Sequence, residues 1–289
     1  MNQIDAVRAM QNYIEQHLSE KITISDLSRV SYYSPWYSHR LFLTHLGITP
    51  SEYIRKLKLS ISALELRDNE AKIIDIAYQY GYDSVDGYQR AFYKAFGTNP
   101  YEYSKNPKPI ALFTPFKLYE KKEKKTMENL HHVFMTIITK PKRKVIIKRG
   151  VAAKDYFSYC EEVGCDIWGV LMSMKSISDE PVSLWLPQHL IKKNTSLYVQ
   201  GVEVEWDYQE TIPEGFDMID LPEATYLMFQ GQPFEEEDYA EAIQRIWDAI
   251  DHYDPKILGY RFDLSNPRIQ LAPIGTRGYI ELVPISKME

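Results

Sequence analysis

The sequence predicts a protein of two domains, an all-α domain followed by an α+β domain. The chain has 289 residues, which is ample for two domains of ordinary size. A short unit with the same key residues occurs twice in the first 106 residues, fifty residues apart. Later in the chain, helical spacing of apolar residues gives way to short runs rich in β-branched and aromatic residues, which are typical of strands. We therefore expect domains at 1–106 and 129–289, joined by a linker at 107–128.

The repeated unit reads RLFLTHLGITPSEY from Arg40 and RAFYKAFGTNPYEY from Arg90. Serine before a helix can accept a backbone N–H of the first turn, and glycine after a helix tolerates left-handed geometry. Ser34 and Ser84 therefore predict helix starts, and Gly47 and Gly97 predict the corresponding ends. A short helix and a tight turn are expected before each of these helices. Such proportions are those of a helix-turn-helix, whose second helix enters the DNA major groove.

Between the two units, residues 50–66 are expected to form one connecting helix, about 25 Å long at 1.5 Å per residue. A strut of this size can hold two readers roughly one turn of DNA, about 34 Å, apart. Its apolar stripe includes Tyr53 and Leu57, and we expect Lys56 and Lys58 on its outer surface. The aromatic residues common to both units are expected in the core; they are Phe42, Tyr53, Phe92 and Tyr103.

The linker is expected from its prolines and a charged run, although Leu112 and Phe113 suggest that part of it packs on a domain. For the second domain, the pattern predicts strands at 133–139, 145–148, 197–206, 216–221, 226–230 and 279–283, and helices at 155–165 and 240–253. The two cysteines, Cys160 and Cys165, are too few for a disulfide framework and are not expected to face each other on their helix.

The doubled motif, together with Ile76-Ala-x3-Gly81-Tyr-x-Ser84, resembles the AraC/XylS family of transcription regulators over about residues 5–106. The resemblance implies double-stranded promoter DNA as a partner, and RNA polymerase as a further one. By position, it implies DNA-contacting residues on both recognition helices, namely Trp36, His39, Arg40, Val85, Asp86 and Arg90. Asp86 is a poor neighbour for phosphate and Gly87 has no side chain, so we expect the second helix to read sequence weakly. Tyr32 stands where the family often has a turn glycine.

Residues 129–289 resemble the GyrI-like effector-binding domain. The matching stretches are Cys165-Asp-Ile-Trp-Gly, Ile212-Pro-Glu-Gly-Phe, Leu221-Pro-x3-Tyr-x2-Phe-x-Gly, and Pro267-Arg-Ile with Gly278-Tyr-Ile-Glu-Leu-Val-Pro. This resemblance implies two β-α-β-β halves, a ligand cleft between them, and a small hydrophobic or cationic effector of the kind bound in multidrug sensing. It also implies that Glu281, on the final strand, lies in that cleft.

A carboxylate at Glu281, flanked by Tyr279 and Val283 on the same strand face, is expensive to bury without a partner. We therefore hypothesise that Glu281 anchors a cationic ligand, with aromatic walls that add cation–π attraction. The candidate walls are Trp185, Tyr198, Trp206, Tyr226, Phe229 and Tyr260. The alternative is a solvated Glu281. Trp168 and Trp247 are assigned to the core.

The favoured function is a DNA-binding transcription regulator, an activator rather than an enzyme, controlled by a small molecule. Two alternatives remain open for the C-terminal half. One is a small-molecule hydrolase in which Glu281 acts with a hydroxyl such as that of Tyr226. The other is a protein-docking module, because residues 151–289 carry 25 acidic and 10 basic side chains. We expect no cofactor, metal site or membrane association, and a cytoplasmic location in a bacterium, on the nucleoid when DNA is bound.

Overall fold

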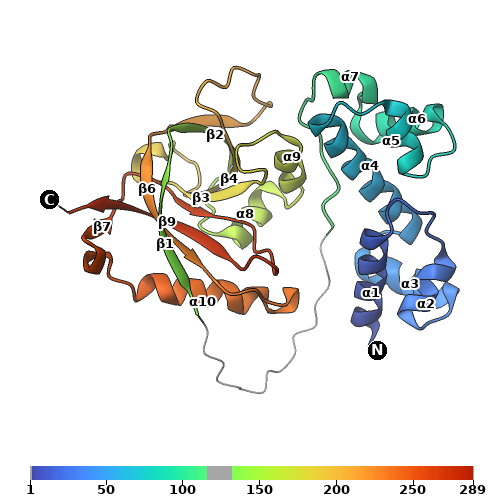
Figure 1. Cartoon of the computed structure of the whole chain (residues 1–289), viewed down its shortest axis with the longest axis horizontal. Coiled ribbons are helices and arrows are strands. Elements are labelled where there is room, and N and C mark those ends of the chain that lie inside the picture. Colours follow the sequence, from blue (N-terminus) through green and yellow to red (C-terminus); the bar gives the residue numbers. More distant parts are fainter. Residues whose placement is uncertain (1, 116–131, 289) are drawn as a thin grey trace. The chain divides into compact units, whose positions relative to one another are not determined.

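The computed structural model describes residues 2–115 and 132–288 (Figure 1). The chain forms two compact units, Met1–Lys122 and Glu123–Glu289, which are considered separately below. Within the described ranges, none of the helices combines the length and the apolar content that crossing a bilayer requires.

In the described part of the first unit, all regular secondary structure is helical. Its helices are α1 (Gln3–Gln16), α2 (Ile24–Ser31), α3 (Pro35–Leu46), α4 (Pro50–Asp68), α5 (Ile73–Gln79), α6 (Val85–Phe96) and α7 (Pro100–Lys105). Ser34 and Ser84 each accept a backbone N–H of the first turn of α3 and α6. Gly47 and Gly97 end these helices with left-handed φ angles of 68° and 71°. Local capping chemistry therefore confirms both predicted helix-turn-helix units, α2–α3 and α5–α6.

The aromatic residues of the doubled unit form the helical cores. Phe42 meets Tyr53 edge to face with ring centroids 5.2 Å apart, and Phe92 lies 5.7 Å from Tyr103. All four side chains are buried. The repeat in the sequence therefore reflects two equivalent packing cores on either side of α4.

The beginning of the expected linker returns to the helical unit. Ile110 and Leu112 are buried. The backbone N–H of Phe113 donates to the hydroxyl of Ser60 at 2.8 Å, and the Phe113 ring lies 5.2 Å from that of Tyr53. Residues 107–115 are thus part of this unit, and the remainder of the expected linker, 116–128, lies outside the described residues.

The second unit is a mixed α+β domain, as expected. Its strands are β1 (Phe134–Lys140), β2 (Arg143–Arg149), β3 (Val182–Trp185), β4 (Tyr198–Val204), β5 (Asp217–Leu221), β6 (Ala224–Gln230), β7 (Tyr260–Phe262), β8 (Arg268–Gln270) and β9 (Ile280–Lys287). Its α-helices are α8 (Tyr156–Val163), α9 (Ile167–Ser173) and α10 (Tyr239–Asp251), with short 3-10 helices at Gln188–Leu190, Glu236–Asp238 and Pro255–Leu258.

One helix differs from its prediction. The helix expected through residue 165 stops at Val163, because Gly164 has φ 95° and turns the chain. Cys165 therefore lies beyond α8 with its thiol near that of Cys160, and burial, with this neighbour as a further cause, raises the pKa of the Cys160 thiol. The expectation that these cysteines do not face each other is wrong, since it assumed one continuous helix.

The sheet is antiparallel in the order β1-β6-β9-β8-β3-β4-β2-β5, with β7 paired to β9. Two halves with matching order, β2-α8-α9-β3-β4 and β6-α10-β8-β9, meet at the central pair of β3 and β8. The architecture therefore consists of two β-α-β-β halves that share one continuous sheet.

Two long ribbons run across both halves. Strand β1 continues into β2 across residues 141–142, and β5 continues into β6 across residues 222–223. Lys140 pairs with Ala224 in one half, and Arg143 pairs with Leu221 in the other, so the register continues without a shift. The outer strands of the two halves are thus parts of one extended antiparallel ladder.

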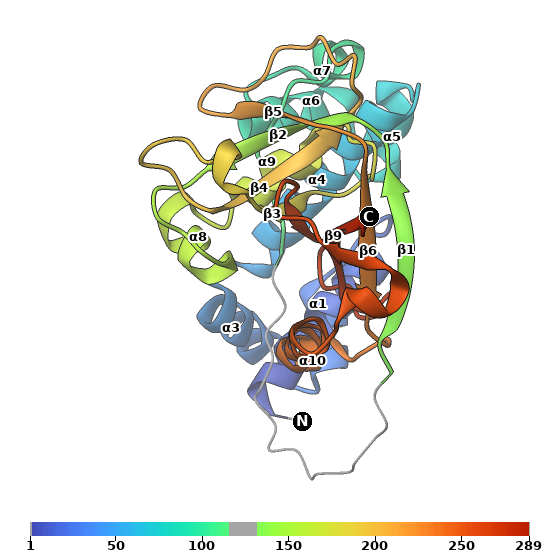
Figure 2. The same cartoon turned by 90° about the vertical axis from the view of Figure 1, so that its left-hand side faces the viewer.

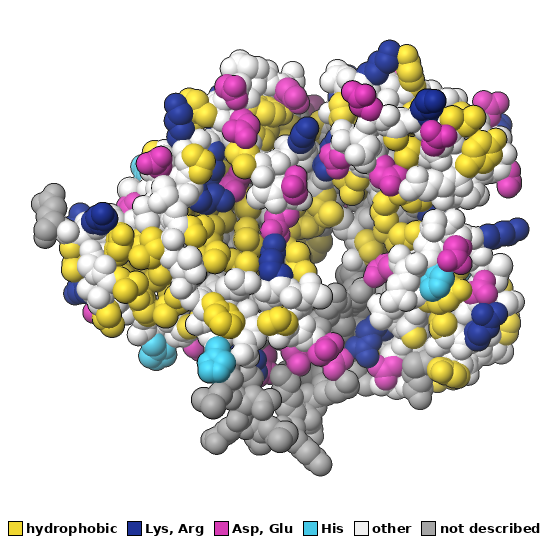
Figure 3. Space-filling model, viewed as in Figure 1, with side chains coloured by type: hydrophobic (Ala, Val, Ile, Leu, Met, Phe, Trp, Pro, Cys, Tyr) yellow, Lys and Arg dark blue, Asp and Glu magenta, His cyan; other side chains and the backbone are white. Residues whose placement is uncertain are grey.

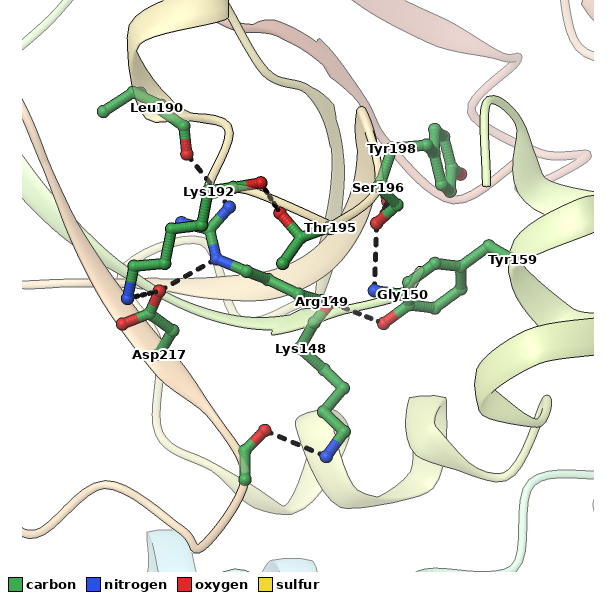
Figure 4. A network of polar contacts seen from close by, with 11 residues as sticks. Lys148, Arg149, Gly150, Tyr159, Leu190, Lys192, Thr195, Ser196, Tyr198 and Asp217 are labelled. Atoms are coloured by element: carbon green, nitrogen blue, oxygen red, sulfur yellow. Dashed lines mark hydrogen bonds and ion pairs between the residues drawn. The ribbon is translucent and has the colours of Figure 1, made fainter. Parts of the chain in front are cut away.

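The three helices cover the same face of the sheet. Ile246 and Ile250 of α10 pack on β6 and β9, and Figure 2 shows α10 nearly end-on beside these strands. Tyr159 of α8 packs on Tyr198 of β4, and Leu171 of α9 packs on the same strand. A polar network holds α8 and the chain before β4 in place (Figure 4): the Tyr159 hydroxyl donates to the Lys148 carbonyl at 2.7 Å.

Strand β1 lies at an edge of the sheet and pairs with β6 alone. Hydrophobic side chains gather on the face of the unit where β1 lies (Figure 3), and those of Phe134, Met135 and Ile137 are exposed. Within the described residues, the other side of this strand has no paired strand.

Candidate functional site

The predicted DNA-contacting residues of the first unit lie on the open face of α3. Trp36 is 69% exposed, and His39 and Arg40 are exposed one turn later. The Arg40 guanidinium lies 5.6 Å from the centre of the Trp36 ring, which orients both side chains toward solvent as one patch. An indole and a guanidinium together suit thymine methyls and guanine edges.

The second recognition helix, α6, presents fewer exposed side chains at the predicted DNA-contacting positions than α3 does. Asp86 and Arg90 are exposed on α6, whereas Val85 and Gly87 are half-buried. The Arg90 Nε atom donates to the Asp86 carbonyl at 3.3 Å, so this side chain folds back along its own helix. The aromatic and imidazole groups of α3 thus have no counterparts at the corresponding positions of α6.

The structure adds four exposed residues one turn further along these helices, which the sequence reasoning missed. They are Leu43 and Thr44 on α3, and Tyr93 and Lys94 on α6. Each pair is related by the same fifty-residue shift as the motif itself. The fifty-residue repeat in the sequence could therefore have identified these four residues.

The turn between α2 and α3 is strained at Tyr32, which stands where the family often has a glycine. Tyr32 ends α2 in the left-handed conformation, with φ 59°, and is 85% exposed. In the second unit, Gly81 has the corresponding positive φ of 75°. A side chain in this conformation costs about 1–2 kcal/mol relative to the right-handed one, and glycine avoids most of that cost.

The position of Lys58 differs from the prediction. It was expected on the surface of α4, but it is buried, and its Nζ atom donates to the carbonyls of Glu20 at 2.9 Å and Tyr80 at 3.1 Å. Burial lowers the pKa of this ammonium group. Because Glu20 follows α1 and Tyr80 ends α5, one side chain of α4 contacts the chain on both sides of it.

In the C-terminal unit, Glu281 is fully buried, so the solvated alternative is wrong. Its Oε1 atom accepts from Trp247 Nε1 at 2.6 Å and from the Tyr279 hydroxyl at 2.5 Å. Its Oε2 atom accepts from Nε and Nη2 of Arg268. The carboxylate therefore already has a cationic partner within the protein. Burial, with the Glu281 charge as the next cause, raises the pKa of the Tyr279 hydroxyl, which keeps it a donor.

Glu281 ends a row of buried polar side chains across the helix-covered face of the sheet. The register places it beside Gln270, then Ser183, then Gln200 on successive strands. The Tyr198 hydroxyl donates to the Gln270 side-chain oxygen at 3.1 Å. Buried polar groups in this number are unusual, since each requires a partner.

A pocket of about 410 Å³ opens next to this row, between the end of β3, α10, the β7–β8 connection and β9. Its lining is largely apolar, with Trp185 on one wall, and its charged side chains are Asp251, Asp263 and Arg268. The Arg268 guanidinium lies 5.0 Å from the centre of the Trp185 ring. Arg268 therefore connects the pocket to the buried carboxylate of Glu281.

The other predicted aromatic residues are distributed over different regions. Tyr198 is buried with its ring 5.0 Å from that of Trp185. Phe229 is opposite Glu281 in the register but packs on Tyr253 in the core. Trp206 lies beyond β4, half-exposed, and Tyr260 packs beside α10. Of the six predicted walls, Trp185 alone lines the pocket described above.

Tyr226 lies on the opposite face of the sheet from Glu281. Phe229 is the residue of β6 paired with Glu281, and Tyr226 is three positions away on that strand. Its hydroxyl accepts from Arg143 Nη2 at 3.3 Å. The pairing of Glu281 with Tyr226, which the hydrolase alternative named, is therefore wrong.

A second buried ionic cluster occupies that opposite face. The Glu203 carboxylate accepts from Arg143 Nε and from Lys140 Nζ, each at 2.5 Å. Arg143 and Glu203 are both 1% exposed. Because both of its cations contact the Glu203 carboxylate inside the protein, we read this cluster as structural.

Comparison with known proteins finds relatives of the helical unit among helix-turn-helix proteins. A family model described as a helix-turn-helix domain matches residues 27–106. Regulatory protein SoxS of Salmonella typhimurium is 34% identical over 103 residues, which make up 36% of this chain and 96% of SoxS. Right origin-binding protein of Escherichia coli is 35% identical over 107 residues, and the match spans 37% of each chain, little more than a third of that relative.

Among solved structures, the C-terminal domain of AraT, a response regulator from Geobacillus stearothermophilus, is 26% identical with a TM-score of 0.35, covering 42% of this chain and 97% of that domain. The DNA-binding domain of AdpA, determined in complex with a target DNA, is 18% identical with a TM-score of 0.33, covering 35% of this chain and 90% of that one.

Proposed function

The chain belongs to the AraC/XylS family of helix-turn-helix transcription regulators, and we propose that it is an activator controlled by a small hydrophobic cation bound in its C-terminal unit. Members of this family bind DNA through the two helix-turn-helix units. We further propose that the chain contacts RNA polymerase and works in the bacterial cytoplasm. Its domains span residues 1–106 and 129–289 in this proposal, and the second is a GyrI-like effector-binding domain.

For DNA, we propose that the two recognition helices contribute unequally. Helix α3 offers Trp36, His39 and Arg40 together, whereas α6 offers Asp86 beside an Arg90 that is bonded to its own helix. In this mode α3 supplies most of the sequence discrimination, and α6 mainly positions the protein on the backbone.

For the effector, the observation that carries the proposal is the apolar pocket beside the buried Glu281–Arg268 pair. Ligand sites are typically concave, largely apolar and equipped with a few placed polar groups. A pocket of about 410 Å³ is in the range that accepts a drug-sized molecule. The acidic balance of the unit favours a cation over an anion.

The DNA half of the proposal is tested by selecting binding sites from random-sequence DNA with the full chain. Two preferred blocks about one helical turn apart are expected. Trp36→Ala and Arg40→Ala should reduce affinity for the selected site about 10-fold, at about 1–3 kcal/mol per base contact, and relax preference in one block. The matched substitutions in α6, Val85→Ala and Arg90→Ala, should relax preference less. Equal loss in both blocks would contradict the unequal roles.

The effector half is tested by thermal unfolding of the full chain against hydrophobic cations and neutral compounds of similar size. A cation that raises the melting temperature, and also changes affinity for the selected DNA, would support control by a ligand. If DNA binding is normal and every compound leaves both quantities unchanged, effector control is wrong while the DNA-binding role stands.

A further inference from the structure

We propose that Arg268 is a built-in counter-ion for Glu281, and that a hydrophobic cation binds by displacing the Arg268 guanidinium from that carboxylate. This inference rests on the proposed effector function and specifies the charge of the ligand and the molecular event that binding causes. In this view the Arg268 guanidinium and the effector compete for the same carboxylate, that of Glu281.

The Glu281 carboxylate has no free acceptor position. Each carboxylate oxygen accepts about two hydrogen bonds. Oε1 receives Trp247 Nε1 and the Tyr279 hydroxyl, and Oε2 receives two nitrogens of Arg268. Glu281 also has no solvent-exposed surface. A ligand cation can therefore approach this charge only after one of the three donors has moved.

Of the three donors, Arg268 is the one that the surrounding packing restrains least. Tyr279 is fully buried and lies on the same chain segment as Glu281, and Trp247 packs with the core of α10 and β9. The Arg268 side chain is 29% exposed, lines the pocket and extends from a strand of three residues. Its second contact is with the face of Trp185. A delocalised cation in the pocket can replace it at both contacts, the carboxylate and the indole.

The displaced guanidinium has acceptors in the same pocket. Asp251 and Asp263 both line it. The Asp263 carboxylate is held in place by the Ser265 hydroxyl at 2.6 Å and the Asn266 amide at 2.8 Å. With Glu281, the pocket and its wall hold three carboxylates and the Arg268 guanidinium, and Arg261 lies near Asp263, so an added cation would still find a carboxylate for each positive charge. An added anion would instead face this excess of negative charge.

Displacement also gives binding a way to act at a distance. Arg268 belongs to β8, which pairs with β3 where the two halves of the sheet meet. Releasing it changes the contacts of that central pair between the free and the bound state. A ligand shifts a conformational equilibrium only through such a difference in contacts.

The test uses two probes of the same shape and opposite charge, tetraphenylphosphonium and tetraphenylborate, with the full chain. Calorimetry gives their dissociation constants for the wild type, Arg268→Gln, Glu281→Gln and the control Arg277→Gln. Arg277 is matched to Arg268 because its side chain is also 29% exposed and pairs with one carboxylate, Glu180, away from this pocket. In the wild type, the Arg268 Nε–H signal in nitrogen-edited NMR, assigned by its loss in Arg268→Lys, reports release without any change to the site.

The dissociation constant of the phosphonium should be about tenfold lower for Arg268→Gln than for wild type. For Glu281→Gln it should be at least tenfold higher. Arg277→Gln should bind as wild type does. The Arg268 Nε–H signal should move from a carboxylate-bound to a water-exposed position in step with occupancy. If the phosphonium binds but that signal stays, and Arg268→Gln binds no more tightly, displacement is wrong while the effector function stands.

Preference for the borate, lost in Arg268→Gln, would make Arg268 an anion receptor and overturn the inference. If neither probe binds any of the proteins, this pocket takes no hydrophobic ion, and both the inference and the proposed effector class are wrong. The wild-type NMR measurement decides between these outcomes even where Arg268→Gln is too unstable to purify.

Discussion

The ammonium nitrogen of Lys58 lies 3.1 Å from the carbonyl oxygen of Tyr80, in the interior of the helical unit. The same nitrogen lies 2.9 Å from the carbonyl oxygen of Glu20. Through this one side chain, α4 holds the segment before the first helix-turn-helix and the end of α5 in the second. We therefore expect Lys58 to influence the spacing of the two recognition helices.

Lys58→Met should lower the free energy of unfolding by about 1–3 kcal/mol, because the buried carbonyl of Tyr80 and the partly buried carbonyl of Glu20 lose their donor. It should also weaken binding to a two-block DNA site more than binding to a single block. Urea unfolding and gel-shift titrations measure the two effects. Lys56→Met is the control, since Lys56 is half-exposed on the same helix and contacts Glu52 at the surface and the ring of Phe113, 5.8 Å away. Equal losses on both DNAs would show that Lys58 does not set the spacing.

Tyr103→Phe should leave the protein as stable at pH 7 or raise its free energy of unfolding by about 1 kcal/mol. The Tyr103 hydroxyl is buried and has no hydrogen-bond partner among the residues that the structure describes. Removing an unsatisfied buried group relieves its desolvation cost. Chemical denaturation checks this against Tyr101→Phe, an exposed tyrosine of the same helix. A loss above 1 kcal/mol would mean that the hydroxyl does have a partner in solution.

The helical unit should lose stability at alkaline pH. Burial raises the pKa of Tyr53 and of Tyr103 to about 12, from an ordinary value of 10.0. Above pH 10 the unfolded chain releases protons that the native state retains, so the free energy of unfolding falls as pH rises from about 10 to 12. Each tyrosine contributes up to about 1.4 kcal/mol per pH unit. Denaturant unfolding at a series of pH values gives this dependence. Between pH 10 and 12, the free energy of unfolding should fall less steeply in Tyr103→Phe than in wild type.

Asp86→Asn should raise affinity for DNA several-fold, whatever its sequence. Asp86 is exposed in the first turn of α6, where its charge repels phosphate. Removing that charge should also make binding more dependent on salt, since an unfavourable contact no longer offsets counter-ion release. Glu70→Gln, an exposed residue between α4 and α5, controls for net charge. Fluorescence anisotropy at several salt concentrations distinguishes the two, and equal gains would indicate a general charge effect.

Glu203→Gln should destabilise the C-terminal unit by about 3–5 kcal/mol. The change leaves the fully buried Arg143 guanidinium and the Lys140 ammonium without a negative partner, which is the costly way to break a buried ion pair. Glu205→Gln, exposed two positions later, should change stability by less than about 0.5 kcal/mol. Tryptophan fluorescence during urea unfolding measures both. A loss below 1 kcal/mol would show that the cluster rearranges or takes up water.

Features decided by short-range chemistry were predictable from the sequence. The caps at Ser34 and Gly47 depend on a few neighbouring atoms, and the doubled spacing located the second copy at once. Lys58 was placed wrongly because periodicity assigns any lysine to the surface. Its partners are carbonyls 38 and 22 residues away, which no local pattern reveals.

The candidate effector site was predictable only in part. The strand alternation correctly put Glu281 in a place where a carboxylate needs a partner. The partner itself, Arg268, depends on the register of β8 against β9, where Gln270 pairs with Glu281. A strand of three residues leaves almost no periodic signal, and its register is set by tertiary packing. For the same reason, the sequence could not reveal that Tyr226 points away from this site.

The unshifted register through β1–β2 and β5–β6 limits how the C-terminal unit can move. Each of these two long strands runs through both halves. The halves therefore cannot rotate apart without breaking backbone hydrogen bonds in the ladder. If the unit binds effectors of different size, as proposed, side chains and the chain between β7 and β8 must accommodate them, because the two halves of the sheet move together.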